Sequence, residues 1–293
     1  MGMQLLVNSL YSFLMLALVA ASFFLVFKPS KYFHISHAAV IVLSAYTFLF
    51  CRTAGLGPLF AGVAALAAAT ALGSLSELVL YRRLSVSRDA GIKVLVLSLG
   101  VYLVVQNILS IGFGDQIQLV DPCNGCLRRV LVGSSFVVSS AQLGNVVIAG
   151  TTLAGLLVVW YRTSFGRAAR SVSENRELAG IIGVNTNRII LLSVALGSCV
   201  AGIAGLLIGF EVGITPTAGF SYLLFAIIAM VIGGNESLLG TIAGALLLGA
   251  LQSGTAFFID SKWASTISYV VLIAFLLIRP EGVKSLNLAL ERR

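Results

Sequence analysis

The sequence predicts an all-α protein that crosses a membrane several times. Hydrophobic residues make up 58% of its 293 residues and charged residues only 10%, and the mean hydropathy is +1.02. A soluble domain of this length carries roughly a quarter charged residues. No polar stretch is long enough to bury a core of its own, so we expect one membrane-embedded domain.

The apolar segments divide into nine candidate membrane-spanning helices. The first has no Lys or Arg before Lys28, so it lacks the basic start of a signal peptide and is interpreted as a retained helix. The second, the seventh and the ninth are shorter than the about 20 residues of a full crossing. We therefore predict a polytopic bundle of about eight spans (roughly seven to ten) with short broken or re-entrant helices. The nine candidates are residues 5–27, 38–51, 58–80, 92–113, 142–160, 189–210, 220–232, 239–258 and 264–279.

The basic residues lie mostly in one set of loops. Residues 28–37, 81–93, 161–188 and 279–293 together hold 15 of the 19 Lys and Arg residues. Such loops favour the cytoplasmic side of a membrane. We therefore expect loop 161–188 and the C-terminus in the cytoplasm and the N-terminus outside, and we do not interpret the net charge of +8 as a sign of nucleic-acid binding.

Small residues are frequent inside the predicted spans, as in 61–73 and 240–249. Small side chains let membrane helices approach closely, which predicts a tightly packed bundle. Residues 55–75 and 233–253 also resemble each other, because each begins with a Gly-rich break and continues as a small-residue helix. Two hypotheses stay open: a duplicated half of a transporter, or the general likeness of Gly- and Ala-rich spans.

The cysteines offer a weak signal in a loop that we place outside. Cys123 and Cys126 form either a small loop disulfide or two free thiols. A zinc site would need two further ligands of suitable spacing. His34 and His37, which we place near the inner surface, are interpreted as structural, and no metal site is predicted.

The polar segment 161–188 is much longer than the roughly 2–8 residues that usually connect two helices. Ser173 is a suitable N-cap, and Glu174 and Glu177 would place negative charge in the first turn of a helix, where the helix dipole favours it. We therefore predict a short helix over 174–182 that begins after Ser173.

This helix would be amphipathic. Leu178, Ile181 and Ile182 follow the i, i+3, i+4 spacing of one apolar face. Gly183 would end the helix, since glycine readily adopts a left-handed conformation. The apolar face must bury itself against the membrane, the rest of the bundle or a partner.

Residues 177–183 (ELAGIIG) resemble the EAA loop of ABC importer permeases, although Leu178 replaces the first Ala of that motif. The longer stretch FGRAARSVSENRELAGIIGVNTNRI (165–189) resembles the corresponding loop of LivH-type permeases of branched-chain amino acid importers. Further similar stretches are ELVLYRRL (77–84), LSLGVYLVVQNI (97–108), residues 213–249 and LLIRPEG (276–282). The clearest departure is segment 31–46, where Ala38 replaces the family's Gly after the His, and this puts the usual substrate in doubt.

The resemblance implies a single permease domain over residues 1–283 and a cytoplasmic tail over 284–293, in a bacterial inner membrane. It implies import of branched-chain amino acids or similar small polar solutes. The chain has no G-x-x-x-x-G-K-[ST] motif, so ATP and Mg²⁺ are expected on partner subunits, and the chain is expected to be a transport subunit without catalytic residues. The residues expected to couple it to the ATPase are Arg167, Arg170, Glu174, Glu177, Leu178, Ala179, Ile181, Ile182 and Gly183.

The implied partners are two cytoplasmic ATP-binding subunits, an extracytoplasmic solute-binding protein and a second permease, either LivM-like or another copy of this chain. Alternatives remain open. A urea or short-amide permease shares these motifs, and a sugar permease of the wider superfamily matches less well. A stand-alone ion-coupled transporter or a membrane-embedded enzyme would leave segment 161–188 unexplained.

Polar residues within the spans are candidates for a substrate path, because a central charge costs about 2.5–3.5 kcal/mol on the insertion scale. The connection after Glu211, from Gly213 to Thr217, predicts a broken helix whose backbone groups hold a zwitterionic solute where they line a cavity. The alternative for each residue is an interhelical hydrogen bond or a position at a helix end. The candidates are Asn8, Gln106, Asn107, Glu211, Thr215 and Thr217.

Overall fold

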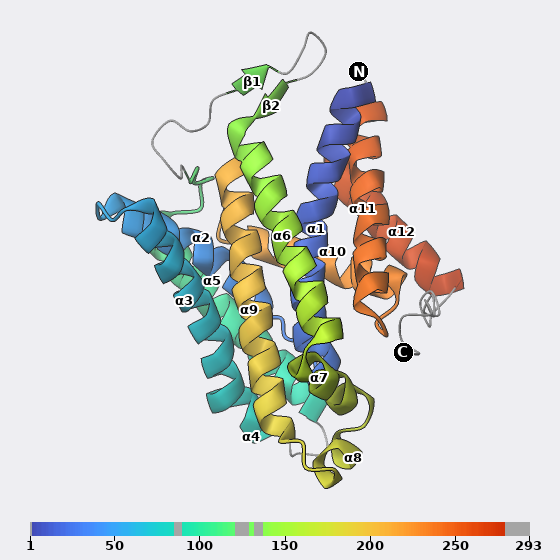
Figure 1. Cartoon of the computed structure of the whole chain (residues 1–293). Helices are drawn as coiled ribbons and strands as arrows, with labels where there is room; N and C mark the ends of the chain where they lie inside the picture. Colours follow the sequence, from blue (N-terminus) through green and yellow to red (C-terminus); the bar gives the residue numbers. More distant parts are fainter. Residues whose placement is uncertain (1, 85–89, 121–128, 132–136, 279–293) are drawn as a thin grey trace.

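The computed structural model describes residues 2–84, 90–120, 129–131 and 137–278 (Figure 1). The structure is an elongated helical bundle with one small hairpin of strands β1 (Arg129–Leu131) and β2 (Val137–Ser139), which pair antiparallel. The helices are α1 (Gly2–Ser30), α2 (His37–Thr53), α3 (Pro58–Leu75), a π-helical turn η1 (Ser76–Tyr81), α4 (Arg82–Leu84), α5 (Ala90–Phe113), α6 (Ser140–Arg162), α7 (Ser164–Glu174), α8 (Arg176–Ile181), α9 (Thr186–Glu211), α10 (Ala218–Gly233), α11 (Leu238–Phe258), a 3₁₀ turn η2 (Ser261–Trp263) and α12 (Ala264–Ile278).

All nine predicted apolar segments form helices, which confirms the all-α membrane bundle. Within the described residues, six helices are long and apolar enough to cross a membrane, namely those that contain α1, α3, α5, α6, α9 and α11. The shorter apolar helices are α2, α10 and α12, and these are the segments whose length had indicated broken or re-entrant helices. We call the end of the bundle that carries the N-terminus the N-terminal end, and the opposite end the α8 end (Figure 1).

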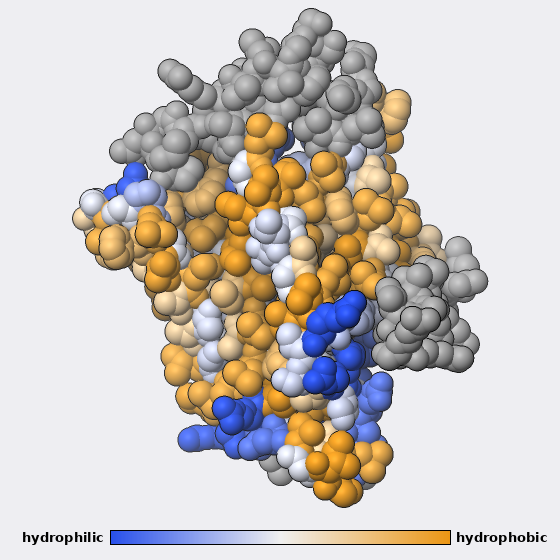
Figure 2. All heavy atoms as spheres, in the orientation of Figure 1, coloured by the Kyte–Doolittle hydropathy of each residue, from blue (hydrophilic) through white to orange (hydrophobic). Residues whose placement is uncertain are grey.

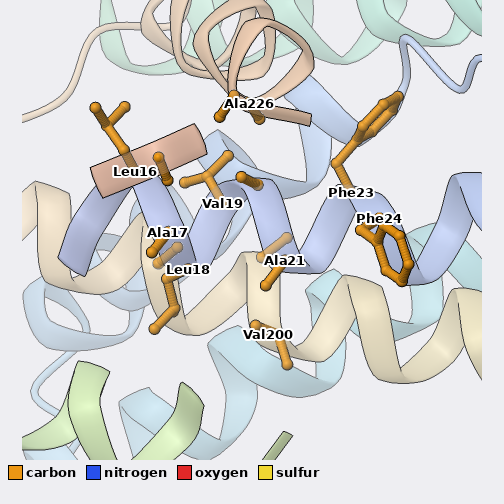
Figure 3. Packing of buried hydrophobic residues seen from close by; sticks show 14 of the residues in the cluster. Leu16, Ala17, Leu18, Val19, Ala21, Phe23, Phe24, Val200 and Ala226 are labelled. Carbon is orange, nitrogen blue, oxygen red and sulfur yellow. The ribbon is translucent and has the colours of Figure 1, made fainter. Parts of the chain in front are cut away.

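Helix α1 is the centre of the bundle. In its spanning window 67% of the residues are buried, against 22% for α5. Its side chains pack in every direction: Leu16 and Leu18 point to opposite sides of the helix, while Val200 of α9 and Ala226 of α10 close in around it (Figure 3). A helix that is apolar all round belongs inside a bundle, so the sequence of α1 suits its position.

Two glycines allow unusually close contact between helices. A Cβ atom at Gly205 of α9 would overlap the carbonyl oxygen of Ile41 in α2, and one at Gly219 of α10 would overlap that of Ala38. Because lipid gives membrane helices no hydrophobic drive to associate, this close approach is a main source of packing energy. In the two predicted stretches, a Cβ atom at Gly73 would overlap Ser198 and one at Gly244 the carbonyl of Ala229, whereas Gly62 has open space around it.

Helix α2 begins inside the bundle, so the side chain of His37, which we placed near the inner surface, is buried among helices. His37 is 3% exposed, and its Nε2 lies 3.0 Å from Oγ of Ser22 in the last third of α1. Lys31 adopts a positive φ of 63°, and after this turn α2 packs mainly against α3 and α9 rather than along α1. His34, 2% exposed, is likewise buried.

The first and last thirds of the bundle have matching elements that run in opposite directions. Gly197 of α9 packs on Val26 of α1, and Ile208 and Leu16 line one cavity, so α1 and α9 are antiparallel. In each third a long helix is followed by a short helix, a break and a small-residue helix: α1, α2 and α3 in one, and α9, α10 and α11 in the other.

The two small-residue helices complete this inverted arrangement. Helix α3 is antiparallel to α9, because Gly73 packs on Ser198 and Gly202 on Ala69. Helix α11 is antiparallel to α1, because Gly249 packs on the backbone of Phe13 while Glu236, just before α11, pairs with Lys28 near the end of α1. As a result α3 runs towards the α8 end and α11 away from it (Figure 1). The similarity between 55–75 and 233–253 thus corresponds to equivalent places in the fold.

Candidate functional site

The polar segment 161–188 forms two consecutive short helices at the α8 end. Thr163 caps α7, because its side-chain oxygen accepts a hydrogen bond from the backbone N–H of Gly166. Asn175 caps α8 and accepts hydrogen bonds of 3.0 Å from the N–H groups of Glu177 and Leu178. Gly183 follows α8 with a φ of +90°, in the left-handed conformation that the sequence predicted.

The predicted start of the amphipathic helix was wrong. Ser173 lies in the last turn of α7, is buried, and donates a hydrogen bond to the carbonyl of Ala169. Glu174 is the last residue of α7 rather than the first of the next helix. The break lies at Asn175, whose backbone is extended (φ −147°, ψ 109°). Asparagine caps helices as well as serine does. Because Ser173 is part of α7, Asn175 is the residue that is left to cap α8.

Helix α7 packs onto the bundle. Its buried positions are Gly166, Ala169, Val172 and Ser173. Arg170 donates a hydrogen bond to the carbonyl of Trp160, and its guanidinium lies 5.5 Å from the centre of the Tyr161 ring. Arg170 is therefore engaged with α6, whereas Arg167 is exposed.

Helix α8 exposes its large apolar side chains. Only Ala179 faces inward, where it joins Val26, Val172, Ile190 and Val194 in a small cluster. Leu178, Ile181 and Ile182 are 59%, 80% and 73% exposed, and Glu174 and Glu177 are also exposed. Apolar atoms accordingly cover the tip of the molecule over α8 (Figure 2).

The exposed side chains of α8 form what we call the α8 patch: Leu178, Ile181 and Ile182. Helix α8 lies beyond the ends of the neighbouring long helices (Figure 1), and exposed Arg162, Arg167 and Arg188 belong to the same segment. A group of large exposed apolar side chains within a polar segment marks an interaction site. Its position away from the apolar middle of the bundle favours a protein partner over the bilayer.

An ion pair lies at the same end of the bundle. Lys28 Nζ lies 2.9 Å from Glu236 Oε2 and so ties α1 to the turn between α10 and α11. The turn contains Gly234 at a φ of +87°. The hydrogen bond from Lys28, together with its charge, lowers the pKa of Glu236. Burial, and then the charge of Lys28, lowers the pKa of Lys31.

A cavity of about 340 Å³ lies between α1, α9, α10 and α11, beside the N-terminal half of α1. We call it the outer cavity. Its walls combine buried aliphatic and aromatic side chains with hydroxyl and amide groups. The lining residues are Tyr11, Ser12, Met15, Leu16, Ile208, Val212, Ala218, Ser221, Tyr222, Phe225 and Gln252.

Two of the predicted substrate-path residues lie beside this cavity. Glu211, the last residue of α9, is half-buried and directly precedes Val212 of the lining. Asn8 is exposed one helical turn before Tyr11 and Ser12. Thr215 and Thr217 belong to the connection that leads to the cavity, and their hydroxyl oxygens are 3.3 Å apart.

The predicted break between α9 and α10 exists, but its backbone is partly occupied. Ile214 and Gln118 exchange two backbone hydrogen bonds of 2.9 Å each, and Tyr46 donates a hydrogen bond to the carbonyl of Ile214. This pairing fixes the connection against the segment after α5.

Gln106 and Asn107 lie away from the outer cavity, on α5. Asn107 is exposed and its amide nitrogen donates to the carbonyl of Leu103 at 2.7 Å. Gln106 is half-buried. The structure therefore does not bring these two residues together with Asn8 and Glu211.

Sequence reasoning missed several polar residues around the cavity. Tyr11 is 9% exposed, and Asn145 of α6 is buried nearby, with its amide nitrogen donating to the carbonyl of Leu207 at 3.0 Å. Gln252 donates to the hydroxyl of Ser268 at 3.2 Å. The available signal was a polar side chain at helical spacing from Asn8 (Tyr11, Ser12) and an amide within an otherwise apolar span.

Metal ligands do not cluster in the described part of the chain. Cys51 and Cys199 are free thiols there, and Cys123 and Cys126 lie outside the described residues. The nearest approach of a histidine to a carboxylate is that of His34 Nε2 and Glu77 Oε2, at 3.8 Å.

Comparison with known proteins identifies the family. Residues 5–276 match the family model described as the branched-chain amino acid transport system/permease component. The chain belongs to this family. It is therefore a multi-pass membrane protein and the permease component of an ABC-type transport system, in agreement with the fold and with the loop motif of 165–189.

Individual relatives support the assignment over most of the chain. The high-affinity branched-chain amino acid transport system permease protein LivH of Salmonella typhimurium is 30% identical over 254 residues, which cover 85% of this chain and 81% of the relative. The corresponding protein BraD of Pseudomonas aeruginosa is 32% identical over 148 residues, or 50% of this chain and 48% of the relative.

The fold also occurs in a solved structure. PsaBC from Streptococcus pneumoniae in complex with Fab is similar with a TM-score of 0.54, over 96% of this chain and 94% of the other. The identity is only 13%, so the similarity concerns the fold alone.

Proposed function

We propose that this chain is the membrane-spanning subunit of a bacterial importer for branched-chain amino acids, and that α8 couples it to the ATP-binding subunits. The single observation that carries the coupling role is the α8 patch, where Leu178, Ile181 and Ile182 are more than half exposed at the tip of the molecule. Because a folded protein rarely leaves such side chains in water, the patch is expected to be covered in the assembled transporter.

Behind the patch, α8 is packed against residues of α1, α7 and α9. Ala179 packs with Val172 of α7, Val26 of α1 and Val194 of α9. A force applied to α8 therefore reaches both central helices through close packing, since interiors at this density transmit displacement. Docking of α8 into a mobile ATPase subunit would move α1 and α9 relative to each other.

The energy source lies outside this chain. The sequence contains no phosphate-cradling G-x-x-x-x-G-K-[ST] motif. We infer that two cytoplasmic subunits bind ATP and Mg²⁺, that this chain has no ATPase activity, and that it pairs with a second permease, either a LivM-like chain or another copy. An extracytoplasmic solute-binding protein would deliver the solute to the N-terminal end.

The orientation follows from the basic residues. The α8 end carries Lys28, Lys31, Arg162, Arg176 and Arg188, and the positive-inside rule places such residues in the cytoplasm. We infer that loop 161–188, the turn at Glu236 and the C-terminus are cytoplasmic, in the inner membrane.

The solute is inferred from the family and from the cavity. The relatives named above are branched-chain amino acid permeases, and the outer cavity has aliphatic and aromatic walls with hydroxyl and amide groups at its edge. This combination suits a small solute that has both an apolar and a charged part.

The test is co-purification of this chain with the ATP-binding subunits of its own transporter, before and after replacement of the α8 patch by serine. We expect Leu178→Ser/Ile181→Ser/Ile182→Ser to abolish the association and Gly183→Asp to uncouple uptake from ATP hydrolysis. Ile111→Ser is the matched control, since Ile111 is 87% exposed on α5, outside the loop.

Two results of this co-purification would contradict the proposal. If the serine variant retains the ATP-binding subunits as well as the wild type does, α8 is not the coupling element. If neither form binds an ATP-binding subunit, the proposed function fails as a whole.

A further inference from the structure

We propose that a groove on the outside of the bundle binds one anionic phospholipid, with an acyl chain in the groove and the phosphate between Arg83 and Lys93. The groove measures about 540 Å³ and runs between α5 on one side and the end of α3 with the π-helical turn η1 on the other. We call it the α3–α5 groove. The proposal depends neither on the transported solute nor on the coupling role of α8.

The two helices beside the groove are poorly covered by the rest of the bundle. Both are long and apolar enough to cross a membrane. In their spanning windows only 28% of the residues are buried for the helix that contains α3 and 22% for α5, against 67% for α1. The α3–α5 groove therefore opens towards the hydrocarbon of the bilayer rather than towards water.

The lining of the groove suits a hydrocarbon chain. The lining residues are aliphatic apart from Ser76 and Gly100, and the hydroxyl of Ser76 donates to the carbonyl of Leu72 at 2.7 Å within its own helix. A Cβ atom at Gly100 would meet no atom within 4 Å, so the α5 wall is open at this point. Large side chains on the two walls include Leu75, Val79, Leu80, Leu97, Val101 and Val104.

The length of the groove matches one leaflet of the membrane. On α5 the lining extends from Leu97 to Val105, which at the rise of an α-helix corresponds to about 12 Å. One leaflet contributes about half of the roughly 30 Å hydrocarbon core. A single acyl chain fits this depth, whereas a membrane-spanning helix of a partner would extend well beyond the groove.

Two basic side chains flank one end of the groove. Arg83 lies one turn after Val79, and Lys93 lies one turn before Leu97, so helical spacing places each on the face that lines the groove. Both residues are exposed. Arg83 belongs to α4, which contacts α5 and lies towards the α8 end (Figure 1). The positive charges therefore lie where the groove approaches the membrane surface.

Charge complementarity identifies the head group. Basic sites between membrane helices near the surface bind the phosphates of anionic lipids. The acidic residue of η1, Glu77, is buried and absent from the described lining, and its Oε2 lies 3.8 Å from Nε2 of His34. Its carboxylate is thus directed to His34 rather than to the end of the groove. An anionic phospholipid satisfies the apolar wall and the basic end at the same time.

The competing occupants are a second permease and exchangeable lipid of any kind. A second permease would cover the groove but would bring Arg83 and Lys93 against protein without supplying an anion of its own accord. A lipid without net charge would fill the apolar wall and leave the basic end without a counter-charge. The combination of wall and charges favours the anionic lipid.

The first experiment counts lipids on the full-length permease, with the subunits that it retains on extraction, by native mass spectrometry. The delipidated protein is titrated with phosphatidylglycerol or with phosphatidylcholine that has the same acyl chains. We expect one tightly held phosphatidylglycerol per copy of this chain and an affinity about thirtyfold above that of phosphatidylcholine, since each basic side chain contributes about fivefold. Equal affinities would mean exchangeable lipid only and would overturn the proposal.

Charge variants locate the head group. Arg83→Gln and Lys93→Gln should each weaken phosphatidylglycerol binding about fivefold and leave phosphatidylcholine unchanged. Arg162→Gln is the matched control, because Arg162 is also exposed but lies at the end of α6, outside the groove. A loss of the same size in the control would show that general surface charge attracts the lipid, which contradicts a site.

A second variant locates the acyl chain. Gly100→Leu should abolish the tightly held lipid by filling the groove, and the open space at Gly100 allows the protein to fold. Gly112→Leu is the control, since Gly112 lies on α5 with equally open space but outside the lining. Lipid that stays bound to folded Gly100→Leu protein would contradict the proposal.

Photo-crosslinking in intact cells tests the occupant directly, including the case in which Gly100→Leu does not fold. Val104 belongs to the lining and is 60% exposed, so benzoylphenylalanine in its place would react with whatever fills the groove. We expect a crosslink to phospholipid. A crosslink to a second permease instead would show that the groove is a protein interface and would overturn the proposal.

Discussion

Helices α7 and α8 follow each other directly in the chain and use their apolar residues in opposite ways. Helix α7 turns Ala169 and Val172 into the bundle, whereas α8 turns Ile181 and Ile182 into solvent. The local sequence of each is amphipathic, so amphipathicity alone does not say what an apolar face will contact. The difference arises at Asn175, where the extended backbone changes the direction of the chain.

The comparison predicts that the same substitution has opposite effects in the two helices. A methyl group at Gly166 of α7 would overlap the carbonyl of Trp160, whereas one at Gly180 of α8 would meet open space. We expect Gly166→Ala to destabilise the protein by about 1–3 kcal/mol and Gly180→Ala to be neutral or slightly stabilising. Thermal unfolding of the two purified variants measures the difference, and equal melting temperatures would mean that α7 is not packed as described.

A substitution at Gly183, just after α8, should loosen that helix without destabilising the rest of the bundle. Gly183 has a φ of +90°, and an L-residue there costs about 1–2 kcal/mol. Since α8 contributes only Ala179 to the buried cluster, we expect Gly183→Ala to increase hydrogen exchange in α8 without lowering the melting temperature of the bundle. Gly91→Ala is the control, because Gly91 has open space around it; a global loss of stability would show that α8 is part of the core.

Removal of the Asn175 cap between α7 and α8 should destabilise the protein less than Gly166→Ala and Gly183→Ala. Asn175→Ala removes both side-chain hydrogen bonds to the N–H groups of Glu177 and Leu178, at a cost of about 1 kcal/mol. We expect these two amides to exchange about five times faster, while amides within α7 keep their rates. Faster exchange throughout α7 would indicate that the two helices form one cooperative unit.

The ion pair between Lys28 and Glu236 should have the smallest effect. The pKa of Glu236 is lowered in the folded state, so the unfolded state binds more protons as the pH falls, and the stabilisation present at neutral pH disappears in acid. Because Glu236 is largely exposed, we expect Glu236→Gln to cost less than about 1 kcal/mol near pH 7. The difference in unfolding free energy between Glu236→Gln and the wild type should disappear below about pH 4. A difference that persists at that pH would show that its origin is not ionic.

Much of the fold could be predicted because hydrophobicity over about 20 residues is a local property. The segment 92–113 became α5 (Ala90–Phe113), and 239–258 became α11 (Leu238–Phe258). The depth at which α2 starts could not be predicted, because it depends on the reversal at Lys31 and on the contact between His37 and Ser22, which lie far apart in the sequence.

The candidate site could be predicted in part: the apolar face of α8 was found, and the α8 cap and the cavity were not. The spacing of Leu178, Ile181 and Ile182 identified the apolar face of α8, because helical periodicity alone places these residues together. The choice of Asn175 over Ser173 as the cap depended on α7, and α7 depends on its contact with Trp160. Tyr11 and Gln252 were missed because a cavity between four helices has no signature in any one of them.

The inverted arrangement of the two thirds has a consequence for the direction of movement. A structure made of two similar units that face opposite ways has no built-in preference for one side of the membrane. Helices α7 and α8 occur once, between α6 and α9, and only at one end of the bundle. This single insertion breaks the symmetry of the described bundle, because it lies outside both groups of helices, and under the proposed coupling role it would make the two sides of the membrane unequal.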